Sequence, residues 1–212
     1  MEQNIVINCD NMEYMRGLSD GHFDFAICDP PYGIGKDWKK RKNNKRFITT
    51  SYENNPVSAD YFKEVKRVAK NWIIFGWNYY TEILGSTNYL LIWDKMASNN
   101  NVVRFSKCEI ACTNIKIPCN IVHIEWEGCR MDSERGTHKI HPHQKPVALY
   151  RWILREYAQK GWTIFDPNVG SGSSRIAADI EGFEFCGCEI DPLYFSMQQK
   201  RYDNFKNQLK LL

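Results

Sequence analysis

Short apolar runs alternate with amphipathic segments along nearly the whole chain, and this alternation limits the folds that the sequence can adopt. The strand-like runs are NIVIN (4–8), FDFAIC (23–28), WIIFGW (72–77), YLLIWD (89–94), CEIACTNI (108–115), IVHIEW (121–126), WTIFD (162–166) and FEFCGCEI (183–190). Helical patterns lie at 11–18, 58–70, 146–160, 173–182 and 192–205, with a short one after 77. Strands that alternate with helices are typical of a mostly parallel sheet covered on both faces. The sequence therefore predicts a doubly wound α/β fold.

Length and composition set the class of protein. The chain has 212 residues, 43% of them hydrophobic and 25% charged, which suits one globular domain over 1–212. It has neither a signal-peptide pattern nor an apolar run near the ~18 residues of a membrane span, so we expect a cytoplasmic protein without a membrane partner. The eight cysteines include no C-x-x-C pair, so we expect reduced thiols and no bound metal.

One basic segment stands out from an otherwise acidic chain. Residues 36–46 hold seven Lys or Arg and one Asp, whereas the net charge of the whole chain is only +3. The segment, about 36–57, is either a solvated loop or a phosphate-contacting one. A second polar stretch covers about 127–144. Both stretches fit the alternation of strands and helices poorly.

The octapeptide CDPPYGIG (28–35) completes one of the apolar runs. Two consecutive prolines stand between an acid, Asp29, and an aromatic residue, Tyr32. Proline fixes φ near about −65°, so the backbone of this loop has a defined course. The segment is either a rigid turn or a device that holds a ligand against Asp29 and Tyr32.

A glycine-containing turn in FDPNVGSGSS (165–174) joins a strand-like run to a helical one. Gly170 and Gly172 let the backbone approach a ligand, and the helix that follows offers unpaired N–H groups. An acid at the end of the next strand, Glu189, suits ribose hydroxyls. The dinucleotide and P-loop patterns are absent, which favours a nucleoside without a pyrophosphate over those ligands. A purely structural turn is the alternative.

The segment HPHQKP (141–146) precedes a helical pattern. His138, His141 and His143 suggest a metal site, but no Cys or acid joins them at a suitable spacing. Lys145 opposes the dipole of the helix that it precedes. A bound carboxylate would explain this lysine, and a solvated side chain is the ordinary reading.

Together these motifs resemble those of the amino-methylating DNA methyltransferases, which use S-adenosylmethionine (SAM). DPPY (29–32) is similar to their catalytic motif, DPNVGSGSS (166–174) to their cofactor motif, and QKP (144–146) to the motif before their cofactor-side helix. The order of the motifs resembles that of the β class, and the similarity extends over about 5–201. It implies the Rossmann-like, seven-stranded type of sheet of SAM-dependent methyltransferases.

The resemblance also implies a cofactor site. Its residues would be Asp10, Cys28, Lys145, Asp166, Asn168, Gly170, Ser171, Gly172 and Glu189. Glu189 would bind the ribose and Lys145 would face the methionine carboxylate. Asp10 would lie near the adenine, or it caps the helix that follows it. Asn168 replaces a common phenylalanine, and Ser173 and Ser174 replace the usual threonines, so individual cofactor contacts differ from those of the family.

The catalytic motif implies a specific chemistry. Asp29 and the carbonyl of Pro30 would accept the two N–H groups of an exocyclic amine, Pro31 would help to fix that carbonyl, and Tyr32 would stack on a flipped base. Asp before Pro-Pro-Tyr favours N6-methylation of adenine in DNA. The alternatives are N4-methylation of cytosine and a silent subunit that binds SAM or nucleic acid.

The basic segment follows the catalytic motif directly, which favours its contact with DNA phosphates. Its candidate residues are Lys36, Trp38, Lys39, Lys40, Arg41, Lys42, Lys45 and Arg46. The chain leaves little room for the target-recognition region that such enzymes carry, and the polar stretches at about 36–57 and 127–144 are the candidate DNA-recognition segments. We therefore expect a short target sequence, or help from a second copy or a partner subunit.

Overall fold

The computed structural model describes residues 4–34, 55–96, 106–127, 130–131, 134 and 138–209. The strands are β1 (Asn4–Asn8), β2 (Phe23–Cys28), β3 (Ala69–Phe75), β4 (Leu90–Asp94), β5 (Cys108–Thr113), β6 (Asn120–His123), β7 (Trp126–Glu127), β8 (Arg130–Met131), β9 (Thr163–Asp166) and β10 (Glu184–Glu189). The helices are α1 (Asn11–Arg16), α2 (Ala59–Val68), the 3-10 turn η3 (Trp77–Tyr79), α3 (Thr81–Leu84), α4 (Val147–Tyr157), α5 (Ser173–Glu181) and α6 (Pro192–Leu209). All eight candidate DNA-contacting residues of the basic segment lie outside the described residues.

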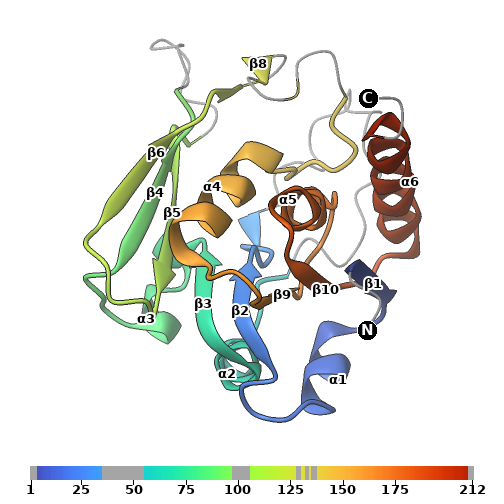
Figure 1. The fold of residues 1–212 in the computed structure, drawn as a ribbon. Helices are drawn as coiled ribbons and strands as arrows, with labels where there is room; N and C mark the ends of the chain where they lie inside the picture. The colour runs from blue at the N-terminus through green and yellow to red at the C-terminus, as the bar shows by residue number, and fades with distance from the viewer. Residues whose placement is uncertain are drawn as a thin grey trace.

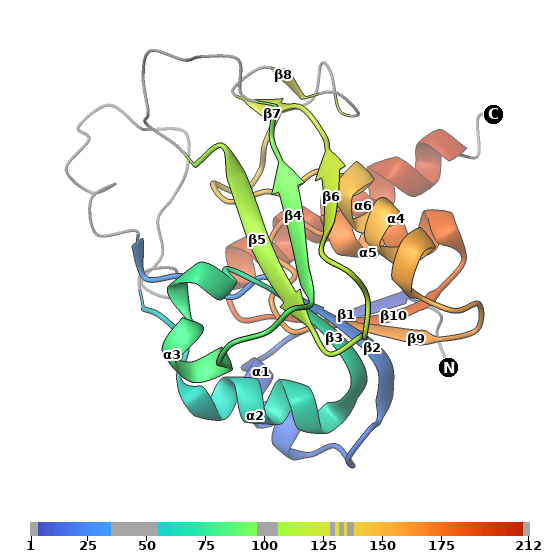
Figure 2. The ribbon, with the colours of Figure 1, turned by 90° about the vertical axis from the view of Figure 1, so that its left-hand side faces the viewer.

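The strands confirm the predicted α/β fold. Within the described residues, eight strands form one sheet in the order β1-β10-β9-β2-β3-β5-β4-β6 (Figures 1 and 2). Every neighbouring pair is parallel except those that β5 makes with β3 and β4. The sheet is thus mostly parallel, as predicted, and has one strand more than the seven-stranded type. Strands β7 and β8 form a separate small hairpin within the polar stretch 127–144 and at its start.

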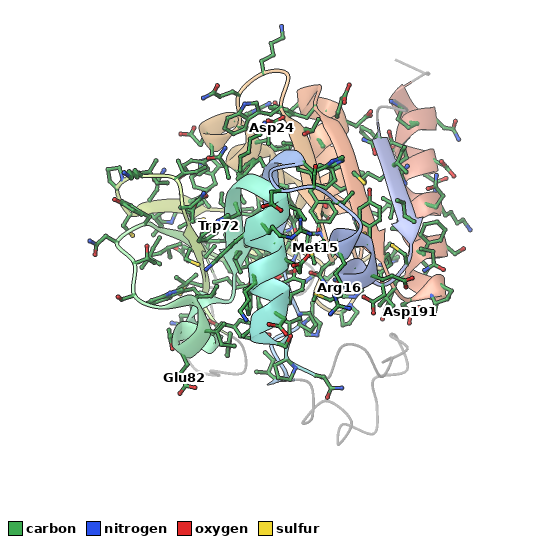
Figure 3. The ribbon with its side chains drawn as sticks, turned by 90° about the horizontal axis from the view of Figure 1, so that it is seen from below. Met15, Arg16, Asp24, Trp72, Glu82 and Asp191 are labelled. Atoms are coloured by element: carbon green, nitrogen blue, oxygen red, sulfur yellow. The ribbon has the colours of Figure 1, made fainter. Side chains whose placement is uncertain are left out.

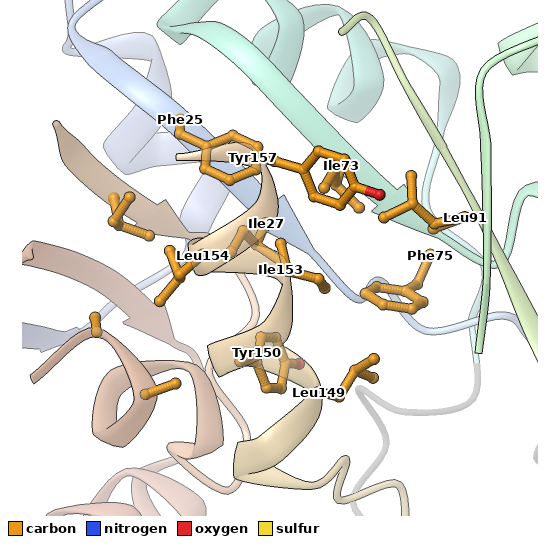
Figure 4. Close-up of a cluster of buried hydrophobic side chains, with 14 of the residues drawn as sticks. Phe25, Ile27, Ile73, Phe75, Leu91, Leu149, Tyr150, Ile153, Leu154 and Tyr157 are labelled. Atoms are coloured by element: carbon orange, nitrogen blue, oxygen red, sulfur yellow. The ribbon is translucent and has the colours of Figure 1, made fainter. Parts of the chain in front are cut away.

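Helices cover both faces of the sheet, and the alternation of side chains along β2 shows how. Phe25 and Ile27 point into a core shared with α4 (Figure 4), while Ala26 and Cys28 point into a core shared with α1 and α2. Figure 3 views the molecule from the side of α1 and α2, with Met15 of the second core labelled. Because both faces are buried, the strands read as nearly continuous apolar runs.

Two helix boundaries show why the sequence patterns end where they do. The side chain of Asp10 caps α1 by accepting from the backbone N–H groups of Met12 (2.7 Å) and Glu13 (3.2 Å). Helix α2 stops at Val68, two residues before the predicted end at 70, because β3 begins directly at Ala69. None of the helices in the described ranges is long and apolar enough to cross a bilayer.

Four acids follow one another along a single edge of the sheet. Glu189 and Asp166 end the neighbouring strands β10 and β9, Asp29 follows β2 directly, and Asp10 follows β1 after one residue. These strands are consecutive and parallel in the sheet, so their carboxyl ends lie at the same edge. Ligands of open α/β sheets bind at that edge. The fold therefore brings the predicted catalytic and cofactor residues to one place.

Candidate active site

The carboxylate of Asp29 is held at both of its oxygens. Tyr32 donates its hydroxyl proton to Oδ1 (2.6 Å), and the Lys145 ammonium lies 2.6 Å from Oδ2. Burial and the charge of Asp29 raise the pKa of Tyr32 well above its ordinary value, so the hydroxyl keeps the proton that it donates. Each carboxylate oxygen has two lone pairs. Asp29 is thus oriented and can still accept a further N–H.

Residues from other parts of the chain hold the proline loop in place. The Tyr80 hydroxyl donates to the carbonyl of Pro31 and accepts from the backbone N–H of Val57 (3.2 Å). Gly33 has φ +73°, and a Cβ there would lie 2.8 Å from the Pro56 ring. Only glycine fits this position. These contacts hold the backbone between Asp29 and Tyr32 in one course.

The ring of Tyr32 is wedged between a glycine and a second tyrosine. A Cβ on Gly76, which has φ +75°, would lie 2.2 Å from the Tyr32 ring. On another side Tyr79 stacks on Tyr32, with ring centroids 4.9 Å apart and an interplanar angle of 16°. Tyr79 is 45% exposed, more than Tyr32. Tyr79 therefore covers one face of the Tyr32 ring, for which the sequence predicts stacking with a base.

Lys145 is buried, with only 4% of its side chain exposed, and it pairs with two acids of the protein itself. Its ammonium lies 2.6 Å from Asp29 Oδ2 and 2.7 Å from Glu109 Oε2, and Glu109 Oε1 lies 2.6 Å from the ammonium of Lys95. Burial opposes the charged form of Lys145, but Asp29 and Glu109 raise its pKa above the ordinary value. Burial likewise opposes ionisation of Glu109, yet the two lysines lower its pKa to about 2. Lys145 and Glu109 are therefore both charged at neutral pH.

Asp166 lies at the turn between β9 and α5 and is held without a cation. Its Oδ1 accepts from the backbone N–H of Asn168 (2.8 Å), and its Oδ2 accepts from the Ser174 hydroxyl (2.5 Å). Ser174 therefore supplies a hydroxyl contact to Asp166. Burial, aided by the charges of Asp29 and Glu189, raises the pKa of Asp166 to about 7. Asn168 in turn accepts from Tyr61 through Oδ1 (2.5 Å).

Glu189 braces the glycine turn from the neighbouring strand. Its two carboxylate oxygens accept from the backbone N–H groups of Gly170 (2.8 Å) and Asp191 (2.9 Å). Burial raises the pKa of Glu189 above its ordinary value. Gly170 and Gly172 both have positive φ, +52° and +76°, so glycine is needed here for the backbone as well. The backbone carbonyl of Ser171 accepts from Arg201 of α6 (2.8 Å).

Two of the predicted cofactor residues have structural contacts of their own. Asp10 caps α1, which is one of its two predicted roles. The side chain of Cys28 is fully buried in the core beneath α1 and α2, so its backbone is the part that could contribute to a cofactor site. His141 packs edge-on against Tyr194, with centroids 4.4 Å apart, and lies next to Gly170. The described part of the chain contains no cluster of three or more metal-ligating side chains, and its seven cysteines are free thiols.

Sequence reasoning missed the residues that surround the motifs in space. They are Glu109, Lys95, Tyr79, Tyr80, Tyr61 and His141 in its place beside Gly170. One of them carried a signal. Glu109 is a lone acid in the otherwise apolar strand-like run CEIACT, and an acid buried in a covered strand requires a partner of opposite charge.

Comparison with known proteins identifies the family. The family model described as DNA methylase (N6_N4_Mtase) matches residues 93–200, just over half of the chain. The chain belongs to this DNA methylase family. The type II methyltransferase M.HpaI of Haemophilus parainfluenzae is 24% identical to it, over 96% of this chain and 75% of that protein. The DNA adenine methyltransferase YhdJ of Escherichia coli is also 24% identical, over 95% of this chain and 83% of that protein.

Solved methyltransferases have the same fold. The M1.HpyAVI–SAM complex matches with a TM-score of 0.60 at 18% identity, over 92% of this chain and 98% of that one. The PvuII cytosine-N4-specific DNA methyltransferase matches with a TM-score of 0.65 at 13% identity, over 95% and 87%. The DNA methylase family transfers methyl groups from SAM to amino nitrogens of adenine or cytosine. This activity and this cofactor are those of the chain.

The residues of the edge suit SAM. Its sulfonium and amino groups are cationic and its ribose carries two hydroxyls, so carboxylates are the appropriate partners. Burial raises the pKa values of Asp166 and Glu189, which means that each gains from a nearby positive charge. The two glycines with positive φ leave the backbone of the turn open to close approach. The chemistry and the backbone of this site therefore fit the cofactor.

Proposed function

We propose that the chain methylates the exocyclic N6 amine of adenine in DNA, with the target base flipped out of the duplex. The observation that carries the proposal is the Asp29 carboxylate, which is oriented by Tyr32 and Lys145 and lies at the edge of the sheet where the predicted cofactor residues also lie. Two further points support adenine. An acid rather than serine precedes Pro-Pro-Tyr, and the relative YhdJ is named a DNA adenine methyltransferase.

The protein's part in the transfer is to prepare the amine. Bound SAM supplies an electrophilic methyl group. The lone pair of an exocyclic amine is delocalised into the base, and Asp29 and the Pro30 carbonyl, by accepting its two N–H groups, favour a pyramidal nitrogen that can use this pair. As the nitrogen–carbon bond forms, the carbon–sulfur bond breaks toward sulfur and the nitrogen becomes positive. The carboxylate of Asp29 stabilises this positive charge, and the nitrogen then releases one proton to solvent.

The cofactor contacts follow the predicted set. In this proposal Asp166, Asn168, Gly170, Ser171 and Gly172 line the SAM pocket, and Glu189 binds the ribose. Asp10 and the backbone of Cys28 lie at its margins. Lys145 faces the methionine carboxylate while it remains paired with Asp29 and Glu109. The third of its ammonium protons points to a weaker partner, Tyr32 Oη at 3.5 Å, and is the one available to a stronger acceptor.

The basic segment is the proposed phosphate contact, and its test is a salt titration. Replacing Lys39, Lys40, Arg41 and Lys42 by Gln should weaken binding to all DNA sequences. It should also reduce the slope of log K against log salt by up to about 3.6, roughly 0.9 per lost contact. Unchanged affinity at low salt would show that the segment does not touch DNA. Binding by a second copy or a partner subunit would appear as a concentration-dependent mass in sedimentation.

One experiment tests the reaction and the base together. The protein is incubated with SAM and unmethylated duplex DNA of varied sequence, and the DNA is digested to nucleosides for mass spectrometry. We expect 6-methyladenine, and none when every adenine is already N6-methylated. 4-Methylcytosine without 6-methyladenine would replace adenine by cytosine, because Asp29 and Pro30 could serve either amine. SAM binding without any methylated nucleoside would favour a silent subunit. A DNA substrate is also the ground for expecting a cytoplasmic protein.

A further inference from the structure

Four side chains of alternating charge form a continuous row that ends at the catalytic carboxylate. They are Lys95, after β4; Glu109, on β5; Lys145, before α4; and Asp29, after β2. The contacts join Lys95 Nζ to Glu109 Oε1 (2.6 Å), Glu109 Oε2 to Lys145 Nζ (2.7 Å), and Lys145 Nζ to Asp29 Oδ2 (2.6 Å). The antiparallel strand β5 thus places Glu109 next to Lys145, which in turn contacts Asp29.

Stability alone does not account for this row. Burying charges costs several kcal/mol per ion, and a buried ion pair is often no more stable than apolar side chains of the same size. The surroundings are apolar: the Lys145 ammonium lies 4.9 Å from the centre of the Phe75 ring, and that of Lys95 lies 5.1 Å from the centre of the Trp93 ring. Charged groups kept in such a place beside a reacting group point to a function.

We propose that Glu109 is a positioning residue for the methyl transfer: anchored by Lys95, it holds the protonated Lys145 against Asp29 and so keeps the acceptor carboxylate oriented. The proposal rests on the proposed function for its catalytic meaning. Asp29 accepts an N–H from the amine through its carboxylate, and the ammonium 2.6 Å from Oδ2 fixes the orientation of that group. Glu109 in turn favours the ammonium, whose burial would otherwise favour its neutral form.

The row also balances charge near the reaction. Two cations and two anions leave it neutral, so a neutral base and a cationic sulfonium can both be accommodated. Without Glu109 the row would carry an extra positive charge, and Lys145 would release its proton at lower pH. Glu109 does not touch the amine in this account. It acts through Lys145, and its loss should therefore be visible in the pH dependence of the reaction.

The decisive variant is Glu109→Gln, which keeps the shape and removes the charge. We expect the alkaline limb of the single-turnover rate to move to lower pH, and on that limb the rate should fall about tenfold for each pKa unit by which Lys145 shifts. Lowering the pH should recover part of the rate. Glu109→Asp should restore most of the wild-type profile. Glu64→Gln is the matched control, because Glu64 pairs with Arg67 on α2 and should leave the profile unchanged.

A second measurement is independent of activity. NMR titration of 15N-labelled lysine side chains reports the pKa of Lys145 directly, and Lys145→Arg identifies the signal by removing it. We expect the pKa to fall in Glu109→Gln and to fall less in Lys95→Gln, the variant to use if Glu109→Gln does not fold. An unchanged Lys145 pKa, or an unchanged pH profile, would overturn the proposal. If the wild-type protein transferred no methyl group, the proposed function would fail while this titration would still decide whether Glu109 controls Lys145.

Discussion

The candidate active site has a cofactor side and a catalytic side, and buried acids are held in opposite ways on the two sides. On the cofactor side, Asp166 and Glu189 are held by backbone N–H groups and a serine hydroxyl, and their pKa values are raised. On the catalytic side, Glu109 lies between two ammonium groups, and its pKa falls to about 2. The first half gains from an incoming cation, and the second is already neutralised. This difference suits a sulfonium cofactor on one side and an uncharged base on the other.

Removing the acid of the catalytic side should have the largest effect. Asp29→Asn keeps the shape of the side chain but loses the charge that orients the amine and stabilises its departing proton. The methyl-transfer rate should fall roughly 10²–10⁴-fold, the range of a lost acid–base group. SAM affinity, measured by calorimetry, should stay within about threefold, because the cofactor side is untouched. A rate near that of the wild type would remove Asp29 from the mechanism.

The raised pKa of Asp166 should appear in the pH dependence of stability. Between about pH 4 and pH 7 the folded protein retains a proton that Asp166 of the unfolded chain, with an ordinary pKa of 3.8, has released. The folded state then binds more protons than the unfolded state, so stability falls as pH rises through this window. The shift from 3.8 to about 7 corresponds to at most about 4 kcal/mol.

Urea unfolding of the wild type and of Asp166→Asn, from pH 4 to pH 8, measures this contribution. The variant should lack the decline, so its stability relative to the wild type should improve as pH rises. SAM should reduce the decline in the wild type, because a bound cation favours the carboxylate. Parallel pH curves for the two proteins would show that Asp166 is ionised throughout and that the two halves do not differ as described.

Two glycines with the same backbone conformation allow a sharper test of the catalytic side. Gly76 (φ +75°, ψ 24°) and Gly182 (φ +77°, ψ 31°) are both left-handed, but a Cβ at Gly76 would meet the Tyr32 ring at 2.2 Å, whereas a Cβ at Gly182 would meet nothing within 4 Å. Gly182→Ala should cost about 1 kcal/mol for the backbone alone. Gly76→Ala should cost about 1–3 kcal/mol more, because Tyr32 must move.

Urea unfolding measures the loss of stability in each variant, and methyl-transfer assays show whether displacement of Tyr32 lowers the activity. Only Gly76→Ala should reduce the transfer rate, since its added methyl group displaces the residue that donates to Asp29. Equal stability and equal activity of the two variants would mean that the Tyr32 ring is not confined by Gly76.

The same contrast explains what the sequence could and could not predict. The apolar runs predicted the sheet, and the motifs predicted which acids lie at its edge, because strand ends and glycine turns are local features. The partner of Lys145 was harder. The sequence offered a bound carboxylate or solvent as the partner of Lys145 and indicated neither Asp29 nor Glu109, which lie 116 and 36 residues away in the chain. Such pairing depends on the order of the strands in the sheet. No local sequence pattern predicts that β5 lies antiparallel between β3 and β4.

Asp10 offers the finest test, because two roles were predicted for it on the cofactor side. As the cap of α1 it should contribute about 1 kcal/mol, which Asp10→Ala would remove. Asp10→Ser can still cap the helix but has no carboxylate. If Asp10 also contacts the cofactor, Asp10→Ser should keep the stability in urea and lower SAM affinity, whereas a residue that only caps would leave both near wild type. Because Oδ1 alone makes the two capping bonds, Oδ2 is the oxygen that a ligand would use. Loss of SAM affinity in Asp10→Ser would therefore show that the cofactor side includes the acid after β1. Unchanged affinity would restrict the cofactor side to the acids that end β9 and β10.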